Sequence, residues 1–193
     1  PDKKPHVGRL LIAEKHVTKT MFMATLIAAL MAFASASAEA QAQGALRVGM
    51  AAGLTAPVSA YASDKDVGYH LALLFDIRVP ATPFGFRIDG QFHEMKYSAN
   101  STKDQILMAT GDAILRVPTG SMIVPYLIGG VGIYNSRRNL FLSSNGSTDP
   151  GVNVGGGLRF ELADVTTFVE ARYHRTSGDA SIRMLPLSLG ILF

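Results

Sequence analysis

Apolar and polar positions alternate strictly over the end of the chain, Arg183–Phe193. Odd positions from 185 to 191 carry Leu, Leu, Leu and Ile, whereas even positions carry Pro, Ser, Gly and Leu. A period of two is that of a β-strand with one apolar face. In outer-membrane barrels such a face contacts lipid, and a terminal aromatic residue lies at the membrane interface. The predicted C-terminal barrel signature is Leu185, Leu187, Leu189, Ile191 and Phe193.

The same alternation, bounded by turn-forming residues, predicts strands throughout the chain after residue 44. The predicted strands are 45–55, 67–79, 84–97, 104–117, 122–136, 151–162, 166–176 and 183–193. The connections at 80–83, 118–121 and 163–165 are short, and those at 56–66, 98–103, 137–150 and 177–182 are mostly longer and more polar. Short turns on one side and longer loops on the other are typical of bacterial barrels with both termini in the periplasm. We therefore predict an all-β fold, an eight-stranded antiparallel up-and-down transmembrane β-barrel.

The faces opposite the apolar stripes carry charged side chains of both signs, which we predict to point into the lumen. This set comprises Arg47, Asp76, Arg78, Arg87, Asp89, Asp112, Arg116, Arg159, Glu161, Glu170 and Arg172. An eight-stranded barrel is only wide enough inside for side chains, and an unpaired buried charge is costly. The set is predicted to form an ion-pair network that fills the lumen. A narrow or gated pore is the alternative.

The aromatic residues also fall at two levels along the predicted strands. Phe84, Phe86, Tyr126, Phe160, Phe168 and Phe193 lie toward the short turns, and Tyr69, Tyr97, Tyr134 and Tyr173 lie toward the loops. Two aromatic levels flanking an apolar band are the girdles of a membrane barrel. The chain contains no Trp, so Tyr and Phe are expected to form both girdles.

The N-terminal part of the chain has the pattern of a secretory signal peptide. Lys15 and Lys19 precede a short apolar run, Met21 to Phe33, and small residues follow it. A basic flank, a short apolar core and small-x-small sites predict export and cleavage, after Ala40 or Ala42. The run is shorter than the roughly 20 apolar residues of a membrane-spanning helix. We interpret 21–42 as a helical signal peptide, 1–20 as a fragmentary or mistranslated leader and 43–193 as the barrel domain.

Composition excludes several functional classes. The chain has no Cys, so it forms neither disulfides nor thiolate metal sites. Its net charge of +3 arises largely before residue 43, and the remainder carries 13 basic and 12 acidic residues. This balance leaves no basic patch for nucleic acid. No feature of the sequence calls for a cofactor.

Four segments of the predicted strands resemble a known family. These segments are Pro125–Tyr134, Val154–Phe160, Val169–His174 and Leu187–Phe193. They are similar to the bacterial eight-stranded outer-membrane β-barrels, the OmpA, OmpX and opacity-like group. The resemblance implies a location in the outer membrane, contact with membrane lipid and lipopolysaccharide, and assembly by the barrel-assembly machinery through the C-terminal strand. It is specific for architecture and does not determine activity.

Two side-chain groups suggest chemistry. His70, His93 and His174 all have inward parity near the loop end, and three imidazoles at one level could bind Zn or Cu. The simpler interpretation is that each forms hydrogen bonds in the lumen, so no metal ligand is assigned. Glu170 and His174 also suggest the Ser-His-acid set of eight-stranded lipid A deacylases. In that family the serine follows the histidine by two residues, where this chain has Thr176, with Ser177 one position further; no catalytic residue is assigned.

The polar segment 137–150 contains another candidate contact. It combines Arg137 and Arg138 with the apolar triplet Leu140–Leu142, which could contact lipopolysaccharide phosphates or a partner, or could simply extend a strand. The sequence thus predicts a non-enzymatic outer-membrane barrel with a structural or surface-interaction role: envelope integrity, adhesion or contact with a surface ligand. A small porin-like channel is the alternative, and a lipid A-modifying hydrolase ranks third.

Overall fold

The structure is a computed structural model that describes residues 46–99, 102–138, 146–162, 165–178 and 181–193. The predicted leader 1–20 and signal peptide 21–42 lie outside the described residues, as does the triplet Leu140–Leu142. No helix in the described ranges is long and apolar enough to cross a membrane.

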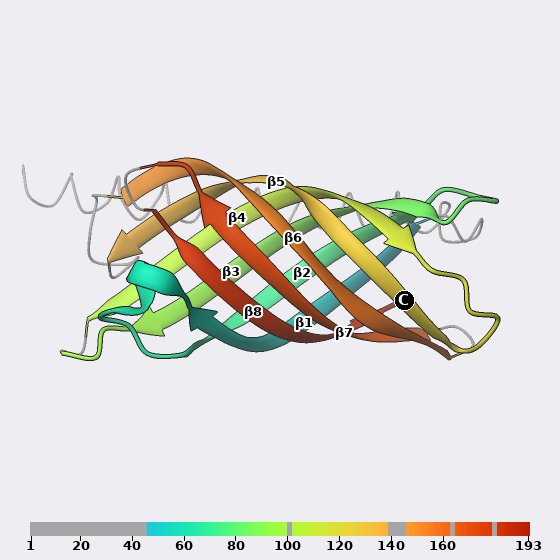
Figure 1. Cartoon of the computed structure of the whole chain (residues 1–193), viewed down its shortest axis with the longest axis horizontal. Helices are drawn as coiled ribbons and strands as arrows, with labels where there is room; N and C mark the ends of the chain where they lie inside the picture. The colour runs from blue at the N-terminus through green and yellow to red at the C-terminus, as the bar shows by residue number, and fades with distance from the viewer. Residues whose placement is uncertain (1–45, 100–101, 139–145, 163–164, 179–180) are drawn as a thin grey trace, which may run out of the picture. The chain divides into compact units, whose positions relative to one another are not determined.

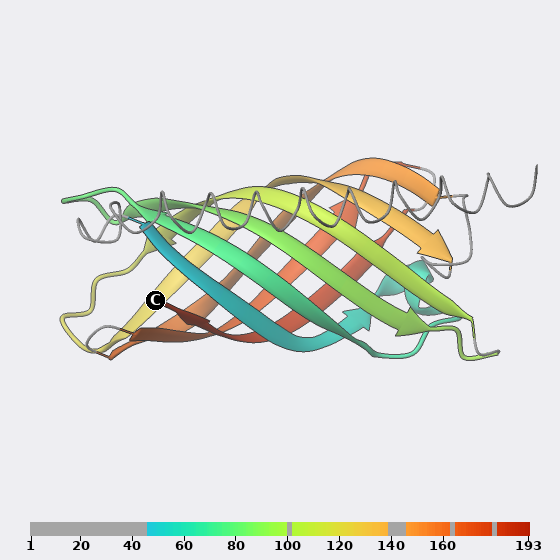
Figure 2. The same cartoon turned by 180° about the vertical axis from the view of Figure 1, so that it is seen from behind.

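Eight antiparallel strands close into one barrel in chain order (Figure 1). The strands are β1 (Leu46–Pro57), β2 (Gly68–Arg78), β3 (Phe84–Lys96), β4 (Lys103–Arg116), β5 (Ile123–Arg138), β6 (Gly146–Leu162), β7 (Val165–Thr176) and β8 (Arg183–Leu192). A short 3₁₀ helix, η1 (Ser59–Ala62), follows β1. Pairing of β1 with β8 completes the barrel, and Figure 2 shows the sheet continuing around its far side. The predicted fold class is confirmed.

The loop predicted at 137–150 is wrong at both ends. The β5–β6 ladder extends to the pair Arg137 and Gly146, so β6 begins five residues before its predicted start whereas β5 passes its predicted end only slightly. Ser, Asn, Asp and Pro in this segment suggested a loop, but polar side chains are compatible with a hairpin that projects into water. The Asn135 amide donates to Thr148 Oγ1 over 2.6 Å across this hairpin.

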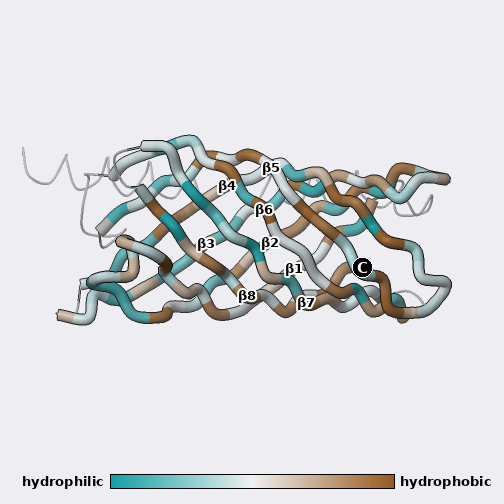
Figure 3. Tube along the Cα trace, viewed as in Figure 1, coloured by the Kyte–Doolittle hydropathy of each residue, from teal (hydrophilic) through white to brown (hydrophobic). Residues whose placement is uncertain are grey.

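Burial alternates along the strands, with the apolar side chains on the outside. The outward residues include Leu189, 65% exposed, and Val131, 64% exposed, whereas the inward positions carry buried charges such as Arg87 and Asp89. Figure 3 shows the resulting mixture of apolar and polar residues along each strand. An apolar exterior around a polar interior is the arrangement required in lipid.

The girdle prediction is wrong for three of its aromatic residues. Phe84, Phe86, Phe193 and Tyr69 are exposed on the outside, as predicted for a girdle. Tyr126, Tyr134 and Phe168, in contrast, are buried and occupy inward positions. Even positions of β5 and β7 face the lumen, and the girdle assignment considered height along the barrel without this parity. These three rings therefore help to fill the interior.

Closure of the barrel depends on Gly53, which lies at the seam between β1 and β8. A Cβ at this position would overlap the carbonyl oxygen of Leu187 and crowd His70, whereas a Cβ at Gly111 would meet nothing within 4 Å. We predict that Gly53→Ala lowers the free energy of unfolding by about 1–3 kcal/mol, because the backbone of β8 must shift. Gly111→Ala is the matched control and should be neutral. Heat-modifiable gel migration and urea titration measure both; equal stability of the two variants would contradict the seam geometry.

Candidate functional site

The lumen contains one connected network of four acids and four arginines. Asp76 of β2 is its acceptor near the turn end and binds three guanidinium groups. Arg116 donates to Oδ1 over 2.7 Å, Arg159 to Oδ2 over 2.5 Å and Arg87 to Oδ2 over 3.3 Å. A single carboxylate thus joins β2 to three other strands.

Deeper in the barrel, Arg172 of β7 is a single arginine surrounded by several carboxylates. Its guanidinium contacts three carboxylates: Asp89 at 2.7 Å, Asp112 at 2.9 Å and Glu170 at 2.5 Å. Arg87 connects the two centres, because it also donates to Glu170 over 2.8 Å. The eight charges are balanced, and all eight side chains are buried. Partial neutralisation of every charge offsets the cost of removing them from water.

The remaining three residues of the predicted set lie outside this network. Arg78 and Glu161 form a separate pair over 2.7 Å and are each more than a third exposed, so this pair contributes little to stability. Arg47 donates to Thr166 Oγ1 and forms no ion pair with a described residue. All three lie at the end of the barrel where the short turns are: Arg78 and Glu161 near strand ends that such turns join, and Arg47 near the start of β1.

Neutral partners of the network were missed by sequence analysis. The Tyr126 hydroxyl donates to Glu170 over 2.7 Å, and the Arg159 guanidinium lies 4.8 Å from the centre of the Tyr126 ring. Asn153 donates to Asp112 over 2.7 Å. The inward parity of β5 would have identified Tyr126, but the contact with Glu170 of β7 depends on how the barrel closes.

Two of the three histidines lie together toward the loop end. His70 and His93 stack with ring centres 4.9 Å apart, and both Nδ1 atoms contact Thr55 Oγ1, at 3.0 and 2.8 Å. Gln91 donates its amide to Asp89, so its oxygen accepts from His93 Nε2 over 3.1 Å. In the neutral ring His93 Nδ1 then accepts from the Thr55 hydroxyl. Each ring nitrogen of this pair thus has a hydrogen-bond partner, since His70 Nε2 contacts Ser188 at 2.9 Å.

His174 takes part in a different contact. Its Nδ1 lies 2.9 Å from the Tyr134 hydroxyl, and its Nε2 is buried without a hydrogen-bond partner among the described residues. Within those residues no group of three His, Asp or Glu side chains is placed to hold a metal ion. The described geometry therefore does not provide the three-imidazole site considered from the sequence.

The Ser-His-acid set that was considered from the sequence, and not assigned, does not assemble among these residues. Glu170 contacts Arg87, Arg172 and Tyr126, while His174 Nδ1, the atom that an acid would orient, contacts Tyr134. Thr176 accepts from the Ile182 amide over 2.9 Å, and Ser177 is exposed. A triad requires contacts from serine to histidine and from histidine to acid, and these residues form neither.

An apolar layer closes the lumen at its loop end. It consists of the buried residues Met95, Ile106, Met108, Tyr134, Ile182 and Met184. Tyr61 of η1 packs against this layer and donates to Asp104 over 2.6 Å. Burial, reinforced by the Asp104 carboxylate, raises the pKa of Tyr61 well above its ordinary value. The phenol therefore remains protonated and keeps its hydrogen bond at physiological pH.

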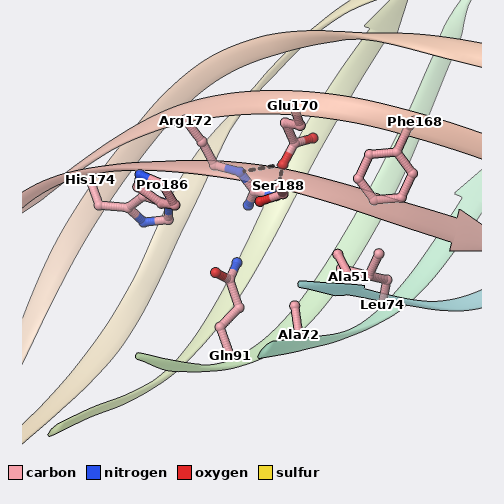
Figure 4. A pocket seen from close by; sticks show the side chains of 10 residues that line it. All are labelled: Ala51, Ala72, Leu74, Gln91, Phe168, Glu170, Arg172, His174, Pro186 and Ser188. Carbon is pink, nitrogen blue, oxygen red and sulfur yellow. Dashed lines mark hydrogen bonds and ion pairs between the residues drawn. The ribbon is translucent and has the colours of Figure 1, made fainter. Parts of the chain in front are cut away.

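Two spaces differ greatly in size: one lies inside the lumen, and the other is an open hollow at the turn end. A cavity of about 10 Å³ lies beside Arg172, His174 and Ser188, as Figure 4 shows. This volume suits one water molecule. A much larger cavity of about 790 Å³ lies among the short turns and reaches Arg78, Arg116 and Glu161. Wide space at the turn end thus leads to the charged network.

The C-terminal signature lies on the outer surface. Leu185, Leu187 and Leu189 are exposed on β8, and Phe193 exchanges backbone hydrogen bonds with Val48 of β1. This places the last residue at the closing seam, where the first and last strands meet.

Comparison with known proteins identifies one matching family model. Residues 25–190 match the model described as outer membrane protein beta-barrel domain. No curated protein sequence matches the chain.

Solved structures resemble the barrel at low sequence identity. Neisserial surface protein A gives a TM-score of 0.62 at 20% identity, covering 76% of this chain and 95% of that chain. The outer membrane enzyme PagL gives 0.51 at 18% identity, covering 76% and 98%. OprG from Pseudomonas aeruginosa gives 0.50 at 14% identity, covering 77% and 94%. These likenesses establish the fold alone.

The network predicts a large effect of removing its shared carboxylate. Asp76→Asn leaves Arg116 and Arg159 without a counter-charge, whereas Arg87 keeps Glu170. We therefore expect the free energy of unfolding to fall by about 3–5 kcal/mol. Glu161→Gln is the control, because the exposed Arg78–Glu161 pair should contribute no more than about 1 kcal/mol. Equilibrium urea unfolding in detergent measures both variants. Similar losses would show that the buried charges are not coupled as described.

Proposed function

Because the chain belongs to the outer membrane protein β-barrel domain family, we propose that it is a sealed barrel that acts through its outer surface rather than by conduction. Family membership places it in the bacterial outer membrane, with its apolar exterior in contact with lipid. The proposed role is structural or surface-interacting: envelope integrity, adhesion or contact with a ligand through the extracellular loops. Lipopolysaccharide is the proposed lipid partner, and the barrel-assembly machinery the proposed partner of the C-terminal strand.

Closure of the lumen is the observation that carries this proposal. The charged network occupies the middle of the barrel, and the apolar layer with Tyr61 lies beyond it. An ion would have to disrupt balanced buried pairs and then cross a mainly apolar layer. Both steps are costly. The geometry therefore favours a structural network over a pore.

The two alternatives receive less support. A channel would use the cavity of about 790 Å³ at the turn end, but this space leads to the network. A lipid hydrolase would need Glu170, His174 and a hydroxyl in contact, and their described partners lie elsewhere. PagL is an enzyme of similar fold, and a shared fold does not transfer its activity.

Conductance in planar bilayers tests the sealed lumen. We predict that the folded full-length protein gives no steady current steps, because the charged network and the apolar layer both fill the lumen in the part of the chain that the structure describes. Heat-modifiable gel migration of the same sample controls for folding. Reproducible steps of one size from folded protein would contradict the proposal and favour the channel.

A further inference from the structure

Two arginines lie directly opposite each other on the outer surface at the loop end. Arg175 of β7 pairs in register with Arg183 of β8. Arg175 is exposed and Arg183 half-buried, and both share the outward parity of Leu185. Neither forms an ion pair with any residue that the structure describes. Like charges directly across a strand pair are destabilising, so this pair calls for a counter-charge.

The barrel has a second like-charge pair, which it neutralises internally. Lys96 of β3 lies opposite Lys103 of β4, also on the outward face. There Glu94 accepts from Lys103 over 2.6 Å. The lysine pair thus has a carboxylate partner within the chain. Among the described residues, the arginine pair has none. The contrast points to an external anion at Arg175 and Arg183.

The position of the arginine pair indicates where that anion comes from. Tyr173 precedes Arg175 on the outward face of β7, and Leu185 follows Arg183 on that of β8. On the membrane side of Leu185, the outward residues Leu187, Leu189 and Ile191 continue the apolar belt. A tyrosine at the edge of such a belt marks the level of the lipid headgroups. The arginines lie one outward position beyond it, at the level expected for the headgroup phosphates.

We propose that Arg175 and Arg183 together bind a phosphate group of an outer-leaflet lipid. Planar guanidinium groups bind phosphate oxygens through paired hydrogen bonds, and adjacent forks can share one phosphate. One bound phosphate would neutralise the repulsion between the strands and fix the lipid at the β7–β8 hairpin. This inference rests on the proposed surface role and deepens it by assigning the residues that bind the lipid and the group that they bind. Failure of this proposal can be distinguished from failure of the sealed-lumen proposal. Conductance reports on the interior of the barrel, whereas lipid binding reports on its outer surface at the loop end.

Native mass spectrometry of the full-length protein in dodecyl maltoside, a detergent without phosphate, tests the proposal. The protein is titrated with lipid A that carries two phosphates and with lipid A whose phosphates have been removed. We expect only the phosphorylated form to be retained, and Arg175→Gln/Arg183→Gln to weaken its binding by roughly tenfold or more. The double lysine variant, Arg175→Lys/Arg183→Lys, keeps the charge but loses the fork and should bind with intermediate affinity.

Lys96→Gln/Lys103→Gln is the matched control, because it removes the same charge from the other outward pair and should leave binding unchanged. Heat-modifiable migration shows that each variant is folded. Phosphatidylglycerol and inorganic phosphate are added as competitors; competition by either supports phosphate recognition and identifies the source. Retention of lipid A by the double glutamine variant at wild-type affinity, or of the dephosphorylated form by wild type, would overturn the proposal.

Discussion

The width of an eight-stranded barrel constrains everything inside it. The interior holds side chains and little else, so each charge that points inward needs a partner from another strand. Asp76 meets this requirement for three arginines, and Arg172 meets it for three carboxylates. Arg87 joins the two centres, so that strands far apart in sequence are fixed relative to one another by one balanced network.

The ratio of arginines to carboxylates in the network changes along the barrel axis. Arginines outnumber carboxylates toward the turn end, where Arg116, Arg159 and Arg87 converge on Asp76. Carboxylates outnumber arginines deeper inside, around Arg172. Beyond them follow the stacked histidine pair and the apolar layer that Tyr61 covers. The interior thus changes from a dense network of ion pairs to a mainly apolar layer in which Tyr61 covers Asp104. This filling leaves the outer surface as the part of the molecule available to partners.

Alternation predicted much of the fold. The strands lay within a few residues of their predicted bounds except at the β5–β6 hairpin, and inward parity was correct for buried residues such as Asp76 and Arg172. Parity is a local property of a strand, with a period of two. Which inward residues meet depends on the stagger between strands, which no single strand encodes. Three arginines therefore converge on Asp76, and His174 contacts Tyr134 rather than the other histidines, without a signal in the local pattern.

Reagent access to a single cysteine in the lumen tests the closed interior most directly. The chain contains no Cys, so each introduced thiol is unique. Ala72 is buried and lines the small cavity near Arg172, whereas Glu161 lies at the open turn end. We predict that Ala72→Cys in the folded protein resists a small charged thiol reagent added from either side, while Glu161→Cys reacts readily. Equal reaction rates at the two positions would contradict the sealed lumen.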